Sequence, residues 1–207
     1  MGFFSLEPES SGLKGTETGE LVVRLKVLVA YATRYDSTKG IANFIAEKLR
    51  QLGLEAVAEE VSAARNLQDY DAFVVGSAVY TRHWLNHARE FVSRNREVLA
   101  SRPVWLFSSG PLGTETKNSH GRDLRDVSGP TEIGTLRQAV RPRSHRVFFG
   151  ALDSSKLGLG HRLIRKMPAA REALSEGDFR NWQEIEGWTI GIAEELMASL
   201  ATQRSVS

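Results

Sequence analysis

Residues 27–38 read Val27-Leu28-Val29-Ala30-Tyr31-Ala32-Thr33-Arg34-Tyr35-Asp36-Ser37-Thr38, an apolar run followed at once by polar, hydroxyl-bearing residues. The run at 25–31 is short and rich in Val and Leu, which is typical of a strand buried on both faces of a parallel sheet. Apolar residues then recur at helical spacing before Gly53, at Ile41, Ala42, Ile45, Ala46 and Leu49. This spacing predicts an amphipathic helix that ends at a glycine.

The same alternation of strands and helices continues toward the C-terminus. Further strands are predicted at residues 54–61, 72–76, 104–108 and 147–151. Helices are predicted over 85–99, over 131–140 with Thr131 as the cap, and over 185–200. Strands that alternate with helices predict an α/β fold, in which a parallel sheet carries helices on both faces.

The length and composition predict one compact domain with appendages. Of the 207 residues 41% are hydrophobic and 25% are charged, which excludes a wholly disordered or collagen-like chain. We expect a disordered leader over 1–23, rich in Gly, Ser, Thr and Glu, then a domain over 24–201 and a tail over 202–207. An insertion is predicted from about residue 114 to about residue 141, between the fourth and fifth strands. We expect it to hold the residues that select a substrate.

The absence of cysteine limits the chemistry open to this chain. It excludes disulfides, thiolate nucleophiles and cysteine-ligated zinc or iron–sulfur centres, so a redox role requires a bound cofactor. The N-terminus lacks the charged and apolar segments of a signal peptide, and no stretch approaches the roughly 18 apolar residues of a membrane-spanning helix. We therefore expect a cytoplasmic protein.

Positive charge is concentrated in the region 137–171, although the whole chain carries a formal charge of only +2. One interpretation is a solvated helix over 156–167 that packs on the sheet and ends at Pro168. The other is a peripheral contact with the inner face of a membrane, which would bring a lipid-soluble quinone within reach. Nucleic-acid binding is not expected, because the region lacks interleaved aromatic residues and a helix-turn-helix pattern.

The loop after the first strand predicts an anion site. Ligands of a doubly wound sheet bind at the carboxyl ends of its strands, and this loop leads directly into a helix whose first amides are unsatisfied. The hydroxyls of Thr33, Ser37 and Thr38, together with these amides, suit a phosphate monoester without a metal ion. The alternative is that Ser37 or Thr38 only caps the helix. No Walker lysine motif and no G-x-G-x-x-G is present at this loop, which disfavours nucleotide triphosphate hydrolysis.

Two further loops follow the third and fourth predicted strands. The first, at 77–84, contains two aromatic residues, Tyr80 and Trp84, which can stack on a flat heterocycle. The second, at 109–113, offers small residues where a backbone can approach the opposite edge of the same heterocycle. Trp84 also has a simpler interpretation as a core residue at the start of a helix.

These segments resemble the flavodoxin-like FMN-binding family, and within it the branch of menaquinone-dependent protoporphyrinogen oxidases. The resemblance rests on residues 27–38, 76–84, 107–111 and 143–153 and covers about residues 24–200. It implies a doubly wound sheet of five parallel strands in the order 2-1-3-4-5, with FMN bound at its carboxyl edge. The implied phosphate loop is Thr33, Arg34, Tyr35, Asp36, Ser37 and Thr38. The implied isoalloxazine neighbours are Ser77, Ala78, Val79, Tyr80, His83, Trp84, Ser109, Gly110, Pro111, Leu112 and Gly113.

Two features depart from the family pattern. Asp36 stands where related sequences often carry glycine; aspartate tolerates a left-handed backbone, and we expect its carboxylate to point away from the phosphate. The slightly basic net charge differs from that of the strongly acidic shuttle flavodoxins, so the chain does not resemble a general electron shuttle.

The resemblance implies an FMN-dependent oxidoreductase that passes electrons from a reduced organic substrate, protoporphyrinogen in the family, to a quinone-type acceptor. Alternatives are an NAD(P)H:quinone reductase and a non-enzymatic binding or regulatory module that has lost the flavin. No catalytic residue is assigned; His83, which follows the predicted third strand, is a candidate to take a proton near the expected ring, and the alternative is a solvent-facing histidine. His83 and His87 are four residues apart, but no third ligand is evident and no metal site is expected.

Overall fold

The computed structural model describes residues 25–153, 155 and 176–204. The predicted leader and the predicted basic helix at 156–167 lie outside these residues. Within the described part of the chain, no helix combines the length and the apolar character needed to cross a bilayer.

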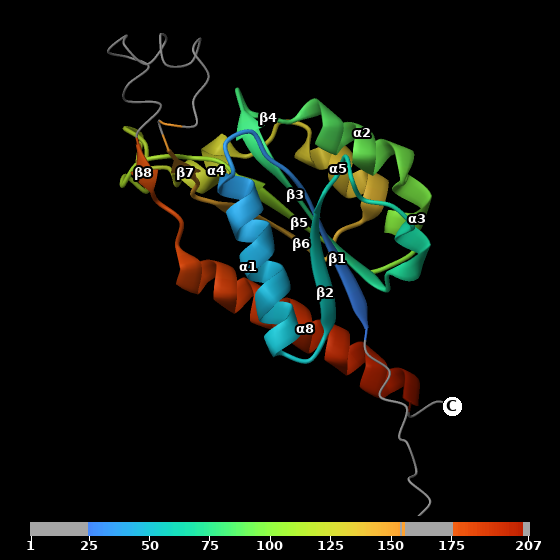
Figure 1. Ribbon diagram of the computed structural model, residues 1–207. Coiled ribbons are helices and arrows are strands. Elements are labelled where there is room, and N and C mark those ends of the chain that lie inside the picture. The colour runs from blue at the N-terminus through green and yellow to red at the C-terminus, as the bar shows by residue number, and fades with distance from the viewer. Residues whose placement is uncertain (1–24, 154, 156–175, 205–207) are drawn as a thin grey trace, which may run out of the picture.

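Five parallel strands form the central sheet in the order β2-β1-β3-β5-β6 (Figure 1). A short sixth strand, β4, pairs antiparallel with the end of β3. The strand bounds are β1 Lys26–Ala32, β2 Glu55–Glu60, β3 Ala72–Tyr80, β4 His83–Trp84, β5 Val104–Ser109 and β6 Ser144–Phe148. Counting the parallel strands alone, the predicted order 2-1-3-4-5 is confirmed, whereas β4 was not expected.

Helices cover both faces of this sheet, as predicted (Figure 1). One face packs against α1 and α8, and the other packs against α2, α3 and α5. The helix bounds are α1 Ser37–Gln51, α2 Asn86–Arg94, α3 Arg96–Ala100, α4 Leu124–Ser128, α5 Ile133–Val140 and α8 Trp182–Arg204, with a 3₁₀ turn η1 at Leu67–Asp69. The helix α8 thus includes the first residues of the predicted tail.

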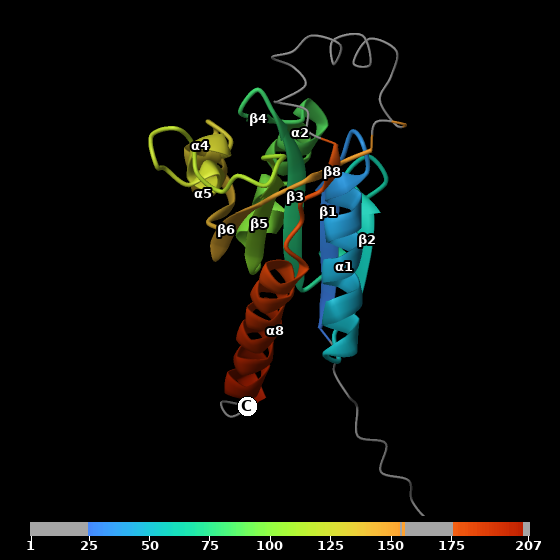
Figure 2. The same cartoon turned by 90° about the vertical axis from the view of Figure 1, so that its left-hand side faces the viewer.

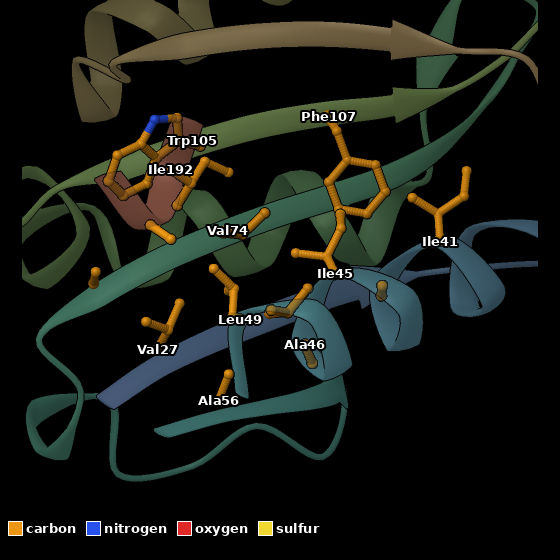
Figure 3. Close-up of a cluster of buried hydrophobic side chains, with 14 of the residues drawn as sticks. Val27, Ile41, Ile45, Ala46, Leu49, Ala56, Val74, Trp105, Phe107 and Ile192 are labelled. Atoms are coloured by element: carbon orange, nitrogen blue, oxygen red, sulfur yellow. The ribbon is translucent and has the colours of Figure 1, made fainter. Parts of the chain in front are cut away.

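The central strands are buried on both faces, which explains their continuous apolar sequences. In β1 every residue from Val27 to Ala32 is buried. Side chains of β1, α1, β3 and β5 pack together in one core layer, to which Ile45, Val74 and Phe107 belong (Figure 3).

Several sequence-based boundaries differ from the structure: β3 continues to Tyr80 rather than ending at residue 76, and α8 begins at Trp182 rather than at 185. The helix predicted over 85–99 is split at Asn95, which has a non-helical φ of −107° and ψ of 18° and whose side-chain amide donates to the Phe91 carbonyl at 2.8 Å. The helix α5 begins at Ile133, and Thr131 is not its cap: the Thr131 backbone N–H and hydroxyl both donate to the Arg82 carbonyl, at 2.9 and 3.3 Å.

The fifth parallel strand was also misplaced. The strand is β6, Ser144–Phe148, and not 147–151. The prediction missed its first residues because they are polar and lie partly or fully exposed at the edge of the sheet. After β6 the chain turns: the Gly150 N–H donates to the Pro111 carbonyl at 2.9 Å. A separate two-residue strand, β7 Ala151–Leu152, then pairs antiparallel with β8 Gly177–Asp178.

The carboxyl ends of the parallel strands meet at one end of the molecule, where β4, α4 and β8 also lie (Figure 2). The predicted insertion supplies α4 and α5 to this part of the molecule. The loops after β1, β3 and β5 are therefore brought to a common edge.

Candidate functional site

A cavity of about 660 Å³ lies at this edge, between the loops that follow β1, β3 and β5. We name it the loop cavity. The predicted site residues that line it are Thr33, Arg34, Tyr35, Ser37, Thr38, Ala78, Val79, Tyr80, Ser109, Gly110, Pro111 and Leu112. Segments separated by more than seventy residues in the sequence are thus brought together, because parallel strands place their carboxyl ends side by side.

The two threonines of the first loop are the most informative side chains. Thr33 Oγ1 and Thr38 Oγ1 are both buried, and neither hydroxyl has a hydrogen-bond partner among the described residues. A buried polar group without a partner costs about 1 to 3 kcal/mol, so such groups are rare in folded proteins. Both hydroxyls belong to residues that line the loop cavity. An anionic oxygen in the cavity would accept from them and remove this cost.

The start of α1 supplies further donors at the same place. Asp36 precedes the helix with φ 64°, a left-handed conformation, and its carbonyl accepts from the Gly40 N–H at 2.9 Å. The first turn of α1 contains no acidic residue. Its free amides and the helix dipole favour a negative charge. Asp36 itself is exposed and lines a neighbouring hollow with Asp153 and Asp178 rather than the loop cavity.

Ser37 has a different role from that of the threonines. Its Oγ accepts from the Ala151 N–H at 2.8 Å and lies 3.1 Å from Ser109 Oγ in a hydroxyl–hydroxyl bond. The chain passes so close at Gly150 that a Cβ there would lie 3.2 Å from Ser109 Oγ and 3.3 Å from Ser37 Oγ. Ser37 therefore ties the loops after β1, β5 and β6 together.

The residues Gly150, Ala151 and Leu152 form part of the cavity lining and were not predicted as site residues. The sequence did contain a signal for these residues, because they belong to the segment 143–153 that carries the family resemblance. The sequence does not show that this segment turns back onto Ser37, since the contact joins residues 114 positions apart.

Aromatic side chains form one wall of the loop cavity. The rings of Tyr35 and Tyr80 lie 6.4 Å apart at an angle of 72°, and the Arg34 guanidinium lies over the Tyr80 ring at 5.4 Å. Burial raises the pKa of Tyr80 to about 12, with Tyr35 adding to the shift and Arg34 opposing it. The phenol of Tyr80 is therefore neutral at ordinary pH, and this wall is suited to packing against a flat ring.

Trp84 and Ser77 lie outside the cavity lining, contrary to the prediction that they flank a bound ring. Trp84 is buried, and its indole N–H donates to Ser108 Oγ at 2.8 Å. The Ser77 hydroxyl donates to the Ala78 carbonyl and accepts from the Leu85 N–H. The structure thus favours the interpretation of Trp84 as a core residue, which is fixed by the hydroxyl of Ser108 on β5.

Ser108 extends this arrangement to a histidine on β6. Ser108 Oγ lies 2.9 Å from Nε2 of His145, and burial, with a contribution from the charge of Arg137, lowers the pKa of His145 to about 4. His145 is therefore neutral. Ser108 Oγ thus accepts from the Trp84 indole N–H and is also hydrogen-bonded to His145 Nε2, in a direction set by the imidazole tautomer.

His83 and Gly113 also lie outside the lining of the loop cavity. His83 is exposed, and its Nδ1 lies 3.0 Å from Glu132 Oε2 and 3.1 Å from Thr131 Oγ1. Gly113 lines a different hollow, of about 730 Å³, beside Phe149 and Trp182. His83 consequently points toward the start of α5 instead of toward the predicted ring position.

The tight turn between β3 and β4 was missed by sequence reasoning. Its central residues, Thr81 and Arg82, line the loop cavity and have φ values of 47° and 62°. A two-residue hairpin turn needs this left-handed backbone, which is normally supplied by Asn or Gly. Glu132 holds the turn in place by accepting from the Trp84 N–H at 2.8 Å. Val127 and Ser128, from α4, complete the lining and gave no signal in the sequence.

The donors and walls of the loop cavity fit a flat heterocycle that carries a phosphate ester. The unpartnered hydroxyls and the helix amides lie on the side of Thr33 and Thr38, whereas Tyr80, Val79 and Pro111 provide apolar surface. Asp36 does not line the cavity, so its charge is not placed among the groups that would hold a phosphate.

Comparison with known proteins agrees with this architecture. Residues 28–176 match the family model of a flavodoxin domain. The protoporphyrinogen IX dehydrogenase [quinone] of Escherichia coli K12 is 30% identical over 182 residues, which cover 82% of this chain and 95% of that protein.

Solved structures share the fold at low identity. A flavodoxin from the domain Archaea superposes with a TM-score of 0.51 at 15% identity, covering 84% of this chain and 99% of that chain. Rubredoxin oxygen:oxidoreductase from Desulfovibrio gigas gives a TM-score of 0.53 at 14% identity over 86% of this chain, which spans only 38% of that longer protein. On the strength of the domain match and of the similarity to the E. coli protein, the chain belongs to the flavodoxin domain family.

Proposed function

We propose that this protein is an FMN-dependent oxidoreductase that transfers electrons from a reduced organic substrate to a quinone-type acceptor. The observation that carries the proposal is that the buried hydroxyls of Thr33, in the loop after β1, and of Thr38, in the first turn of α1, have no partner among the described residues. In a flavodoxin fold this is where a phosphate ester would bind, and the geometry supports FMN over an unphosphorylated flavin.

The residues of the chain would bind and orient the cofactor. Thr33, Thr38 and the first amides of α1 would donate to the phosphate, while Tyr80 and the segment from Ser109 to Leu112 would flank the ring. FMN supplies the redox chemistry when it is bound, and the protein contributes stacking, hydrogen bonds and local charge. No proton-transfer residue is assigned, since His83 faces Glu132 and not the cavity.

The substrate and acceptor are proposed from the relative's name. The E. coli protein is a protoporphyrinogen IX dehydrogenase [quinone], and this chain covers 95% of it. We infer a porphyrinogen-type donor and a quinone acceptor for this chain as well. A contact with a membrane through the region 137–171 stays a prediction, since much of that region lies outside the described residues.

The test is the spectrum of the purified protein followed by anaerobic reduction. We expect the flavin absorbance bands to be present, or to form when FMN is added, and protoporphyrinogen to bleach them. A menaquinone analogue should then restore the bands. Reduction by NADPH alone would favour the NAD(P)H:quinone reductase, and a colourless protein that ignores FMN would favour the non-enzymatic module.

A further inference from the structure

A second hollow, of about 600 Å³, lies directly beside the loop cavity. Arg82 lines both of them. The end of α4 separates them, with Val127 and Ser128 on the side of the loop cavity and Gly129 on the other side. A molecule bound in the second hollow would therefore be next to a ring held in the loop cavity.

Three arginines of this second hollow are available to bind a ligand. The guanidinium groups of Arg82, Arg137 and Arg146 belong to exposed side chains and form no hydrogen bond or ion pair with any described residue. The fourth, Arg125, is occupied: it pairs with Asp123 at 2.6 Å and with Glu184 at 3.0 Å. We name the hollow with its three unpaired guanidinium groups the arginine hollow.

The opposing charge in the arginine hollow is small. Asp126 is the one lining carboxylate that no described cation pairs with, since Asp123 and Glu184 both pair with Arg125. His145 also lines the hollow and is neutral there, because burial lowers the pKa of its imidazole to about 4. Counting only pairs between described residues, three unpaired cations thus line the hollow together with one unpaired anion.

Arg82 is placed at the boundary at an energetic cost. A left-handed backbone costs a residue with a Cβ roughly 1 to 2 kcal/mol. The conformation is maintained because the Arg82 carbonyl accepts from the backbone N–H of Thr131 at 2.9 Å. The residue is therefore fixed where both hollows meet.

We propose that the arginine hollow binds carboxylate groups of the electron donor while the part of the donor that is oxidised reaches the loop cavity. Guanidinium groups bind carboxylates through paired N–H donors, and unpaired ones attract anions to a site. Apolar side chains of Ile133 and Val147 line the same hollow and suit the body of an amphipathic molecule. The inference rests on the proposed function and adds to it the residues that would hold the donor, which is a largely apolar molecule with at least two carboxylates.

The experiment measures binding to the FMN-loaded protein with a dicarboxylate and its neutral ester. Protoporphyrin IX and its dimethyl ester are titrated in the same detergent buffer, and tryptophan quenching reports the Kd. The variants are Arg137→Gln, Arg146→Gln and the double variant. Arg96→Gln is the matched control. Arg96 is exposed on α3, and its substitution changes the net charge by the same amount as each single variant.

We expect each single variant to raise the Kd of the diacid by about fivefold and the double variant by about twentyfold. The ester and the Arg96→Gln protein should change by less than about twofold. The inference would be overturned if the variants weakened binding of the diacid and of the ester equally, or if Arg96→Gln weakened binding of the diacid as much as they do. An effect on NADPH binding alone would also overturn it. The proposed function fails separately, if the unsubstituted protein does not bind FMN. If the protein binds FMN but the arginine substitutions leave the Kd of the diacid unchanged, only the role of the arginine hollow is contradicted.

Discussion

Replacement of Thr38 by valine should change the apoprotein and the FMN complex in opposite directions. Valine keeps the shape of threonine but removes a buried hydroxyl that has no partner in the described structure. Relief of an unsatisfied polar group is worth about 1 to 3 kcal/mol. For a chain of this size each kcal/mol raises the Tm by about 2 to 4 °C, so the apoprotein should melt several degrees higher.

The same substitution should weaken FMN binding. A hydrogen bond to a charged group contributes about 1.5 to 3 kcal/mol, which corresponds to a rise in Kd of roughly 10- to 150-fold. Calorimetric melting of the apoprotein and titration with FMN measure the two effects on one protein preparation.

Thr189→Val is the matched control for this experiment. Thr189 is also completely buried, but its hydroxyl donates to the Ile185 carbonyl at 2.8 Å within α8. We expect this control to lower the Tm slightly and to leave the Kd for FMN unchanged. If Thr38→Val destabilises the apoprotein as Thr189→Val does, or binds FMN normally, the assignment of Thr38 to the phosphate is refuted.

Three further predictions concern β3, the turn between β3 and β4, and β6. Gly76→Ala should destabilise the fold by about 1 to 3 kcal/mol in urea titrations, because the new Cβ would overlap the Phe107 ring; unchanged stability would contradict this packing. Glu132→Ala should cost about 1 to 3 kcal/mol and speed hydrogen exchange at the Trp84 amide, whereas normal protection would show that Glu132 does not hold the turn. The pKa of His145 is lower in the folded protein than in the unfolded chain, so the unfolded chain binds a proton at this imidazole more readily than the folded protein does. Stability should therefore fall by as much as about 3 kcal/mol as the pH drops from about 6.5 to about 4, and His145→Gln should remove this part of the slope.

Much of the fold could be predicted because its signals are local. The apolar run of β1 and the helical spacing of α1 reflect burial on both faces of the strand and on one face of the helix. The edge strand β6 was misplaced because Ser144, His145 and Arg146 are polar. They become part of the sheet through pairing with β5, which hydrophobic periodicity does not reveal.

The candidate site was only partly predictable, for a related reason. The loops after β1, β3 and β5 follow from topology, and most of the predicted residues line one cavity. Trp84 was misread because it is buried and hydrogen-bonded to Ser108 on β5, a contact with a distant part of the chain that the sequence does not show. Arg82 was missed because its left-handed backbone is sustained by Thr131, which is distant in the sequence.

The most direct test of the account is the ratio of the affinities for FMN and riboflavin, measured by calorimetry on the apoprotein. The two ligands differ only in the phosphate, for which Thr33 and Thr38 supply two donors that have no partner within the described part of the chain. We predict that FMN binds at least about 100-fold more tightly than riboflavin. Equal affinities, or binding of neither ligand, would contradict the claim that the turn after β1 binds a phosphate ester.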